Sequence, residues 1–229
     1  FAFIETAQKL SKGGVTDLTT AVDGLSSVVN AYGSDVLSAE QASDPVFTTM
    51  LLGKTNVAEL SAALFQVTPT AAGLGVEFGN VTAALAAMTL QGVPTSVATT
   101  QLRQLFVELS KEGSAAAGTF EELSGKSFRD FIAAGGNVQE ALQVMEKGAA
   151  DTGVSISDMF GSVEAGSAAL ALTGGGTEAF TNALAGMDES AGATEAAFEQ
   201  MNQGLGPTLD KLKAKFSVVM LNIGEQIAP

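Results

Sequence analysis

Two short tails of the type Gly-Lys-Thr/Ser are the residues in this chain whose spacing most resembles a chemical site. They occupy residues 53–55 (GKT) and 125–127 (GKS), and the same tail in a phosphate-binding loop cradles phosphates and reaches Mg²⁺. That loop also needs a glycine five positions upstream, where this chain has Thr48 and Phe120. Neither tail follows a predicted strand, so the sequence does not predict a nucleotide site.

Adjacent carboxylates are the other candidates for chemistry, at Glu121-Glu122 and Asp188-Glu189. Neighbouring residues on a helix point about 100° apart and do not converge on one substrate or metal ion, so we interpret both pairs as solvated. The chain has no His and no Cys, and it therefore lacks the usual general base near neutral pH and the preferred ligands of structural zinc. We expect no enzyme activity, no catalytic residue, and no cofactor or metal site.

The composition indicates a chain with a real core and an acidic surface. Its 229 residues are 46% hydrophobic, and 11 basic against 25 acidic residues give a net charge of −14. Such a charge repels phosphate backbones, so we expect no direct nucleic-acid binding. No apolar run approaches the roughly 18 residues of a membrane span. Because the sequence begins Phe-Ala-Phe without Met, we expect it to be part of a longer protein.

The elements that position these residues are predicted to be helices. Apolar residues recur at helical spacing on one face, as at Leu18, Val22, Leu25, Val29 and Tyr32. Clean alternation of apolar and polar residues, the signal of a strand, is almost missing. The 26 glycines and 5 prolines interrupt the helical pattern. We therefore predict an all-α fold, with many short helices joined by Gly/Pro turns in a compact or jointed array.

Local capping signals predict where several of these helices begin. Asp44 and Pro45 suit the N-cap and first position of one helix, in which Leu51 is expected to face inward. Asn80 and Asn137 are predicted to cap two later helices. Each of these predictions rests on residues close in sequence.

Three parts are predicted along the chain: an N-terminal helical part at 1–112, a Gly/Ala-rich helical part at 113–206, and an amphipathic helix at 207–229 that leads to the next region. In the last part, apolar residues step by three and four as in a heptad seam. The candidate oligomer seam consists of Leu209, Leu212, Phe216, Val219 and Ile223. With fewer than three heptads visible, two alternatives stay open: a coiled coil, or a helix that packs on its own domain.

A series of ordered blocks resembles the core region of phage tail tape measure proteins. The order and spacing of the blocks carry the likeness, which covers most of the chain. The blocks are the Gly-Lys-Thr, Glu-Leu and Ala-Leu placements at 53–64, Val-Thr-Pro at 67–69 with Ala-Ala at 71–72, Leu-Gly-Val at 74–76, residues 84–92 with Leu-Gln-Gly, the helix at 98–109, Gly125 and Phe128 ahead of Gly135-Gly136, and Phe-Gly-Ser-Val-Glu-Ala-Gly at 160–166.

The resemblance implies a structural protein of long-tailed phages. Tape measure chains occupy the lumen of the tail tube, set tail length during assembly in the host cytoplasm, and leave before DNA passes. The resemblance further implies several copies side by side, three or six, and contacts with the tail tube protein, distal tail and hub or baseplate proteins, and tail assembly chaperones. It implies no active site in this segment.

The predicted helix breaks limit that interpretation. A ruler needs a fixed rise, about 1.5 Å per residue in a continuous helix, which interrupted helices do not supply. We therefore expect a folded docking or anchor element near the tail tip, with the measuring helices outside residues 1–229. Two alternatives remain: a membrane-active segment from Gly161 onward that contacts the host membrane at ejection, and an unrelated helical interaction domain of a bacterial surface or secretion system.

Overall fold

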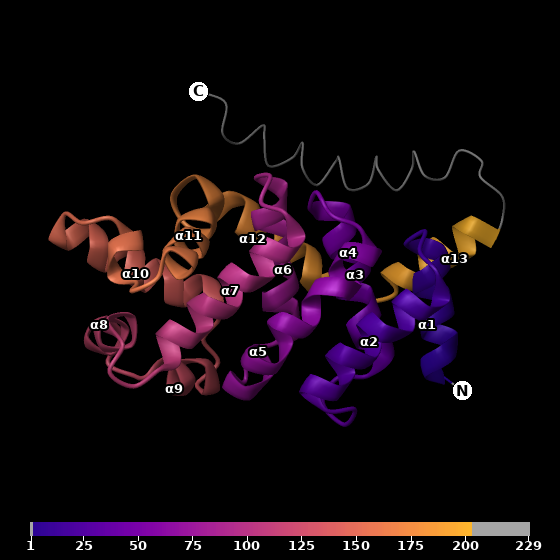
Figure 1. Ribbon diagram of the computed structural model, residues 1–229, viewed down its shortest axis with the longest axis horizontal. Helices are drawn as coiled ribbons and strands as arrows, with labels where there is room; N and C mark the ends of the chain where they lie inside the picture. Colours follow the sequence, from indigo (N-terminus) through magenta and orange to yellow (C-terminus); the bar gives the residue numbers. More distant parts are fainter. Residues whose placement is uncertain (1, 203–229) are drawn as a thin grey trace.

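The computed structural model describes residues 2–202, and every regular element in that range is helical. This confirms the predicted all-α fold of short helices (Figure 1). The helices are α1 (Ala2–Gly13), α2 (Leu18–Tyr32), α3 (Ala39–Leu52), α4 (Val57–Ala63), α5 (Thr68–Leu74), α6 (Phe78–Leu90), α7 (Thr95–Ser110), α8 (Ala115–Ser124), α9 (Phe128–Ala133), α10 (Val138–Thr152), α11 (Val163–Leu172), α12 (Thr177–Asp188) and α13 (Ala193–Asn202), with short 3-10 turns η1 (Leu64–Gln66), η2 (Ile156–Met159) and η3 (Gly174–Gly176).

Helix α3 begins earlier than the sequence analysis predicted. Its N-cap is Ser38, which forms a reciprocal capping box with Gln41, and Pro45 lies inside the helix instead of at its start. The Ser-x-x-Gln pattern at 38–41 is the start signal that the prediction overlooked. Leu51 was also wrongly predicted to face inward, because its side chain is 37% exposed.

The buried face of helix α2 overlaps the predicted stripe of large residues, of which Leu25 is buried and Val22, Val29 and Tyr32 are partly buried against the core. Leu18 is 42% exposed, whereas Ala21, Gly24, Leu25 and Val28 are buried. A Cβ atom placed on Gly24 would lie 2.3 Å from the Ser61 hydroxyl oxygen of α4. Small residues therefore set this interface, because they let the two helices approach more closely than leucines would allow.

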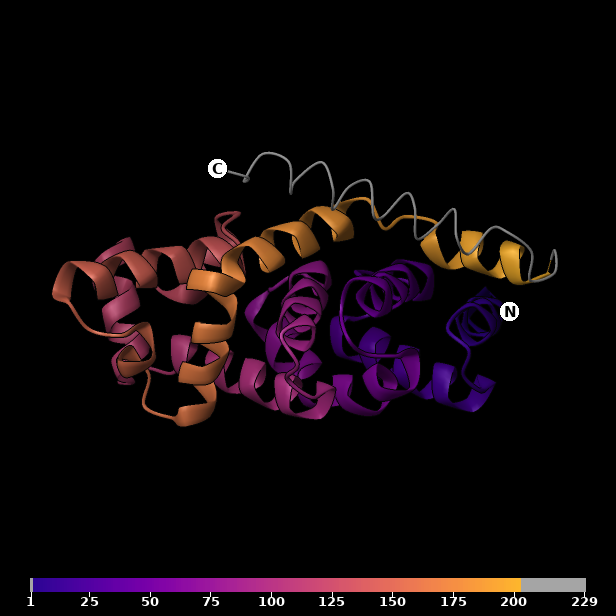
Figure 2. The ribbon, with the colours of Figure 1, turned by 90° about the horizontal axis from the view of Figure 1, so that it is seen from above.

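Helix α6 is the central helix of the molecule. Every residue from Val81 to Thr89 is buried, so this part of α6 is covered on all sides, as expected of a helix inside a core. It contacts α3, α5, α7, α11 and α12 (Figures 1 and 2). Helical spacing alone indicates only the apolar stripe Val81, Leu85 and Met88 as the inward face of this helix.

One end of the molecule is held together by aromatic side chains. The ring centroids of Phe120 and Phe128 are 5.8 Å apart, and those of Phe106 and Phe128 are 6.3 Å apart. Phe131 meets Phe120 edge to face, with centroids 5.4 Å apart. These pairs join α7, α8 and α9, and such pairs contribute roughly 0.5–1.5 kcal/mol each beyond the area they bury.

The later helices return along the earlier ones. Helix α11 packs on α7, α12 packs on α6, and α13 packs on α1. Figure 2 shows α12 and α13 along one edge of the molecule, above the N-terminal helices. The division of the chain after residue 112 stays a prediction, and the helix expected at 207–229, with its seam residues, lies outside the described residues.

Candidate functional site

The first Gly-Lys-Thr tail lies at the joint between α3 and α4. Gly53 ends α3, and the Thr55 hydroxyl is 2.7 Å from the hydroxyl of Thr95, which donates to a Glu59 carboxylate oxygen 2.8 Å away. Thr55 therefore ties the starts of α4 and α7 together. The tail sits between two helices, without the preceding strand that a phosphate-binding loop requires.

The second tail forms the turn between α8 and α9. Gly125 ends α8 in the left-handed conformation with φ of +73°, and Ser127 is the N-cap of α9. A shallow cleft of about 310 Å³ lies beside this turn. Arg129, which lines the cleft, donates to the Gly73 carbonyl oxygen 2.8 Å away and so fastens α9 to α5. Both tails are joints between helices.

The adjacent carboxylates singled out from the sequence lie on the surface. Glu121 and Glu122 are exposed on α8, and Asp188 and Glu189 are exposed at the end of α12. Within residues 2–202, no group of three Asp or Glu side chains is placed to hold a metal ion. In the same range, no helix has the length and apolar character needed to cross a membrane.

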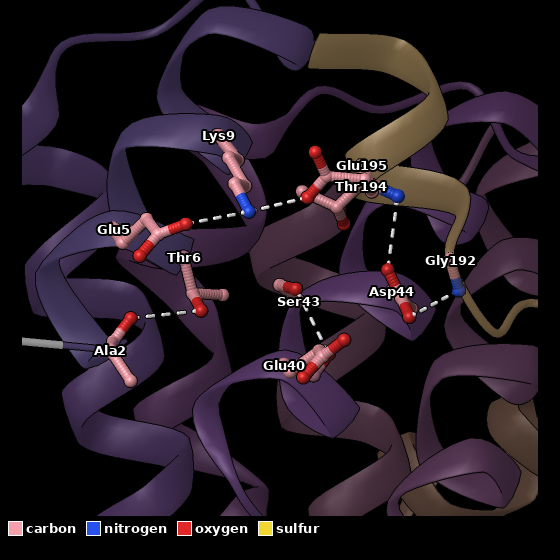
Figure 3. Close-up of polar contacts among 10 residues, drawn as sticks. All are labelled: Ala2, Glu5, Thr6, Lys9, Glu40, Ser43, Asp44, Gly192, Thr194 and Glu195. Atoms are coloured by element: carbon pink, nitrogen blue, oxygen red, sulfur yellow. Dashed lines mark hydrogen bonds and ion pairs between the residues drawn. The ribbon is translucent and has the colours of Figure 1, made fainter. Parts of the chain in front are cut away.

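Asp44, which the sequence analysis treated as a cap for its own helix, is a buried carboxylate whose partners lie far away in sequence. Asp44 is 6% exposed and accepts backbone N–H groups from Gly192 at 2.7 Å and Thr194 at 3.0 Å (Figure 3). It therefore caps the start of α13, 150 residues away in sequence. A carboxylate at a helix N-terminus satisfies unpaired N–H groups and favours the helix dipole.

Basic residues of α1 complete the contact with α13. Lys9 bridges Glu195 of α13 at 2.5 Å and Glu5 of its own helix at 2.9 Å (Figure 3). Hydrogen bonds to Glu195 and then to Glu5 raise the pKa of Lys9 above its ordinary value. Lys12 lies 5.2 Å from the centroid of the Phe198 ring and donates to the Asn202 side-chain oxygen at 3.3 Å. We call Asp44, Lys9 and Lys12, with their partners on α13, the α13 junction.

A second buried carboxylate joins α7 to the start of α11. Glu108 is 8% exposed and accepts the Gly161 N–H at 2.6 Å and the hydroxyl of Ser162, the N-cap of α11, at 2.5 Å. Burial raises the pKa of Glu108, but hydrogen bonds from Ser162, Gly161 and Gln104 outweigh burial and hold it below its ordinary value. The carboxylate is thus kept ionised as an acceptor for a distant helix start.

A third long-range contact corrects the prediction for Asn80. This residue is the third residue of α6, within its first turn, and does not cap it. Its side-chain oxygen accepts the N–H of Val138, the first residue of α10, at 3.2 Å. The prediction for Asn137 was right, since Asn137 caps α10 in a reciprocal box with Glu140.

Three of the polar residues described above have the same structural role. Asp44, Glu108 and Asn80 each accept backbone N–H groups at the start of a helix far away in sequence. Their acceptor atoms are directed at the backbone, so the arrangement holds helices in place. Sequence reasoning missed Asp44 and Glu108 in these roles, although an acidic residue within an apolar helical stripe, such as Glu108 between Leu105 and Leu109, is a usable signal of a buried acceptor.

Comparison with known proteins agrees with this structural role. Residues 1–161 match the model of the phage-related minor tail protein family, and the chain belongs to that family. A probable tape measure protein of Clostridium phage phiCD119 is 41% identical to it over 233 residues, which cover 98% of this chain and 24% of that protein. The chain thus spans about a quarter of the length of this relative. No solved structure is significantly similar.

These matches confirm the resemblance to tape measure proteins found in the sequence blocks. The chain is therefore a member of a phage tail protein family. Its residues 2–202 form an all-α body in which residues distant in sequence bind the starts of α10, α11 and α13.

Proposed function

We propose that this chain is a folded docking or anchor element of a tape measure protein, located near the tail tip. The observation that carries the proposal is the contact between Asp44 and Thr194, which lie 3.0 Å apart and 150 residues apart in sequence. In a continuous helix those residues would be separated by about 225 Å, at about 1.5 Å per residue. Because the chain folds back on itself, this segment adds little length along the tail axis. The measuring helices therefore lie outside residues 1–229.

The whole protein is proposed to occupy the lumen of the tail tube, to set tail length during assembly in the host cytoplasm, and to leave for DNA ejection. The similarity to a probable tape measure protein supports this role. Its proposed partners are further copies of itself as a trimer or hexamer, through the seam Leu209, Leu212, Phe216, Val219 and Ile223, together with the tail tube protein, the distal tail and hub or baseplate proteins, and the tail assembly chaperones.

The excess of acidic over basic residues is compatible with a protein that occupies the same tail tube as DNA. The net charge of −14 offers few cations to bind phosphate, so we propose that the chain does not bind nucleic acid directly. Its polar side chains are used to hold helices, and we propose no catalytic activity for this segment.

Site-specific photo-crosslinking in assembled tails tests the location. A photoreactive residue at Val36, which is 71% exposed in the turn before α3, reports on neighbours. The same residue at Leu85, which is fully buried in α6, is the control and should crosslink only within the chain. We expect Val36 to crosslink to distal tail or hub proteins.

Two results would contradict the docking role. Crosslinks from Val36 to the tail tube protein along the whole tail would place the chain in the ruler. Dye leakage from liposomes on addition of the purified chain would instead favour the membrane-active alternative, in which the host membrane is contacted at ejection.

A further inference from the structure

Helix α13 is attached to the molecule differently from the helix before it. Helix α12 buries Phe180, Ala183 and Met187, and it packs on the central helix α6. Helix α13 packs on α1 and α3, and its buried residues are Thr194 and Ala197. Because large apolar side chains supply most of the stabilisation of a packed helix, α13 is held far less firmly by burial than α12.

Several polar contacts also attach α13, and some of them lie near the surface. Asp44 accepts two N–H groups at its start, Lys9 pairs with Glu195, and Lys12 reaches Asn202 near its end. Side-chain exposure is 23% for Lys9 and 46% for Glu195, so this ion pair is open to screening by salt. Asp44 is the one charged partner of α13 in this set that is itself buried.

Two further features favour separation of α13 from the body. The Thr194 hydroxyl is buried without a hydrogen-bond partner, which costs free energy only while α13 is attached. The link from α12 to α13 passes through Gly192, whose φ of +79° is a conformation that glycine adopts without strain. The unpaired Thr194 hydroxyl thus raises the free energy of the attached state, and Gly192 is suited to act as a hinge in the link.

We propose that α13 is a releasable arm, which detaches from α1 and α3 as a unit while α1 to α12 stay folded. The hydrogen bonds that Asp44 accepts hold the arm in the attached state. Because α13 is followed in the chain by residues 203–229, release would lengthen the connection between the folded body and the next region without unfolding the core. The proposed mechanical role rests on the docking function, whereas the release itself is a property of the isolated chain.

Hydrogen exchange of the purified chain, resolved by helix, tests the release. In the wild type, we expect the amides of α13 to exchange on the order of tenfold or more faster than those of α12 and α6. Exchange of α13 should accelerate in 1 M NaCl, while that of α12 should not. The variant Asp44→Asn should accelerate exchange in α13 alone, because an amide side chain cannot accept both N–H groups equally well. Asp35→Asn, in the exposed turn before α3, is the matched control and should change nothing.

A reversible disulfide between α1 and α13 provides a second test, which does not depend on destabilising the fold. A Cβ atom on Gly13 would lie 3.0 Å from the Cβ atom of Ala197, and the chain has no cysteine. The double variant Gly13→Cys and Ala197→Cys therefore offers one disulfide between α1 and α13 after a small adjustment. Oxidation should slow exchange in α13 towards that of α12, and reductant should reverse the effect.

The proposal fails if wild-type α13 exchanges as slowly as α12 and α6, or if Asp44→Asn accelerates exchange throughout the molecule. Either result would make α13 part of one cooperative body. Neither result would affect the crosslinks expected from Val36, so failure of the arm is distinguishable from failure of the docking function.

Discussion

The Glu108 carboxylate and the Gly161 backbone N–H lie 2.6 Å apart, although 53 residues separate them in sequence. Glu108 also accepts the hydroxyl of Ser162, so one buried side chain on α7 fixes the start of α11. Asp44 does the same for α13 and Asn80 for α10. The fold therefore depends on a few polar residues that join distant helix starts, in addition to its apolar core.

Replacement of Glu108 by Gln should lower the free energy of unfolding by about 1–2 kcal/mol, because a neutral amide accepts the Gly161 and Ser162 donors less strongly than a carboxylate. Denaturant unfolding followed by circular dichroism measures the change. Glu112→Gln, at an exposed position four residues later, is the control and should stay within about 0.5 kcal/mol of the wild type. Equal effects of the two variants would contradict the role of Glu108.

The contribution of Glu108 should also depend on pH. Its pKa in the folded state lies below the ordinary value of 4.5, so its stabilisation is fully present above about pH 5 and is lost as the pH falls through the folded-state pKa. The difference in unfolding free energy between the wild type and Glu108→Gln should therefore shrink on acidification. A difference that grows at low pH would show that the folded-state pKa is raised.

Replacement by alanine should change the stability of the protein in opposite directions at two glycines inside helices. Gly24→Ala should destabilise the protein by about 1–3 kcal/mol, because the new methyl group would meet Ser61, including its Cα atom at 2.9 Å. Gly118→Ala in α8 meets open space and should stabilise by about 0.5–1 kcal/mol through helix propensity. Thermal unfolding of both variants checks the pair, and a stabilising Gly24→Ala would rule out the close approach of α2 and α4.

Loss of the Asn80 side chain should destabilise the attachment of α10. Asn80→Ala removes the acceptor of the Val138 N–H, and we expect a cost of about 1 kcal/mol together with faster hydrogen exchange in the first turn of α10. Asn30→Ala, on the exposed side of α2, should be neutral or slightly stabilising, because alanine favours a helix more than asparagine. An unchanged α10 in the Asn80 variant would show that the contact contributes nothing.

Local sequence signals predicted the features that depend on neighbouring residues. The helical class and the cap at Asn137 follow from spacing and capping chemistry, and the structure confirms them. The start of α3 was misplaced because Pro45 was given more weight than the Ser38 and Gln41 pair.

Features that depend on tertiary contacts could not be predicted in the same way. The full burial of α6 requires knowledge of the helices that surround it. The partners of Asp44 lie 148 and 150 residues away, a distance that no local pattern encodes. Resemblance to tape measure proteins supplied the class of protein, while the residues that hold the helices together came only from the structure.

The central claim, that this chain is a folded element beside the ruler, is tested most directly by tail length in electron micrographs of phage with in-frame deletions in the full-length gene. An equally long deletion in a flanking helical region should shorten tails by about 300 Å, at about 1.5 Å per residue. Deletion of residues 2–202 should instead abolish assembly, or leave tail length unchanged and block DNA delivery. Tails that shorten by about 300 Å on that deletion would show that these residues are part of the ruler.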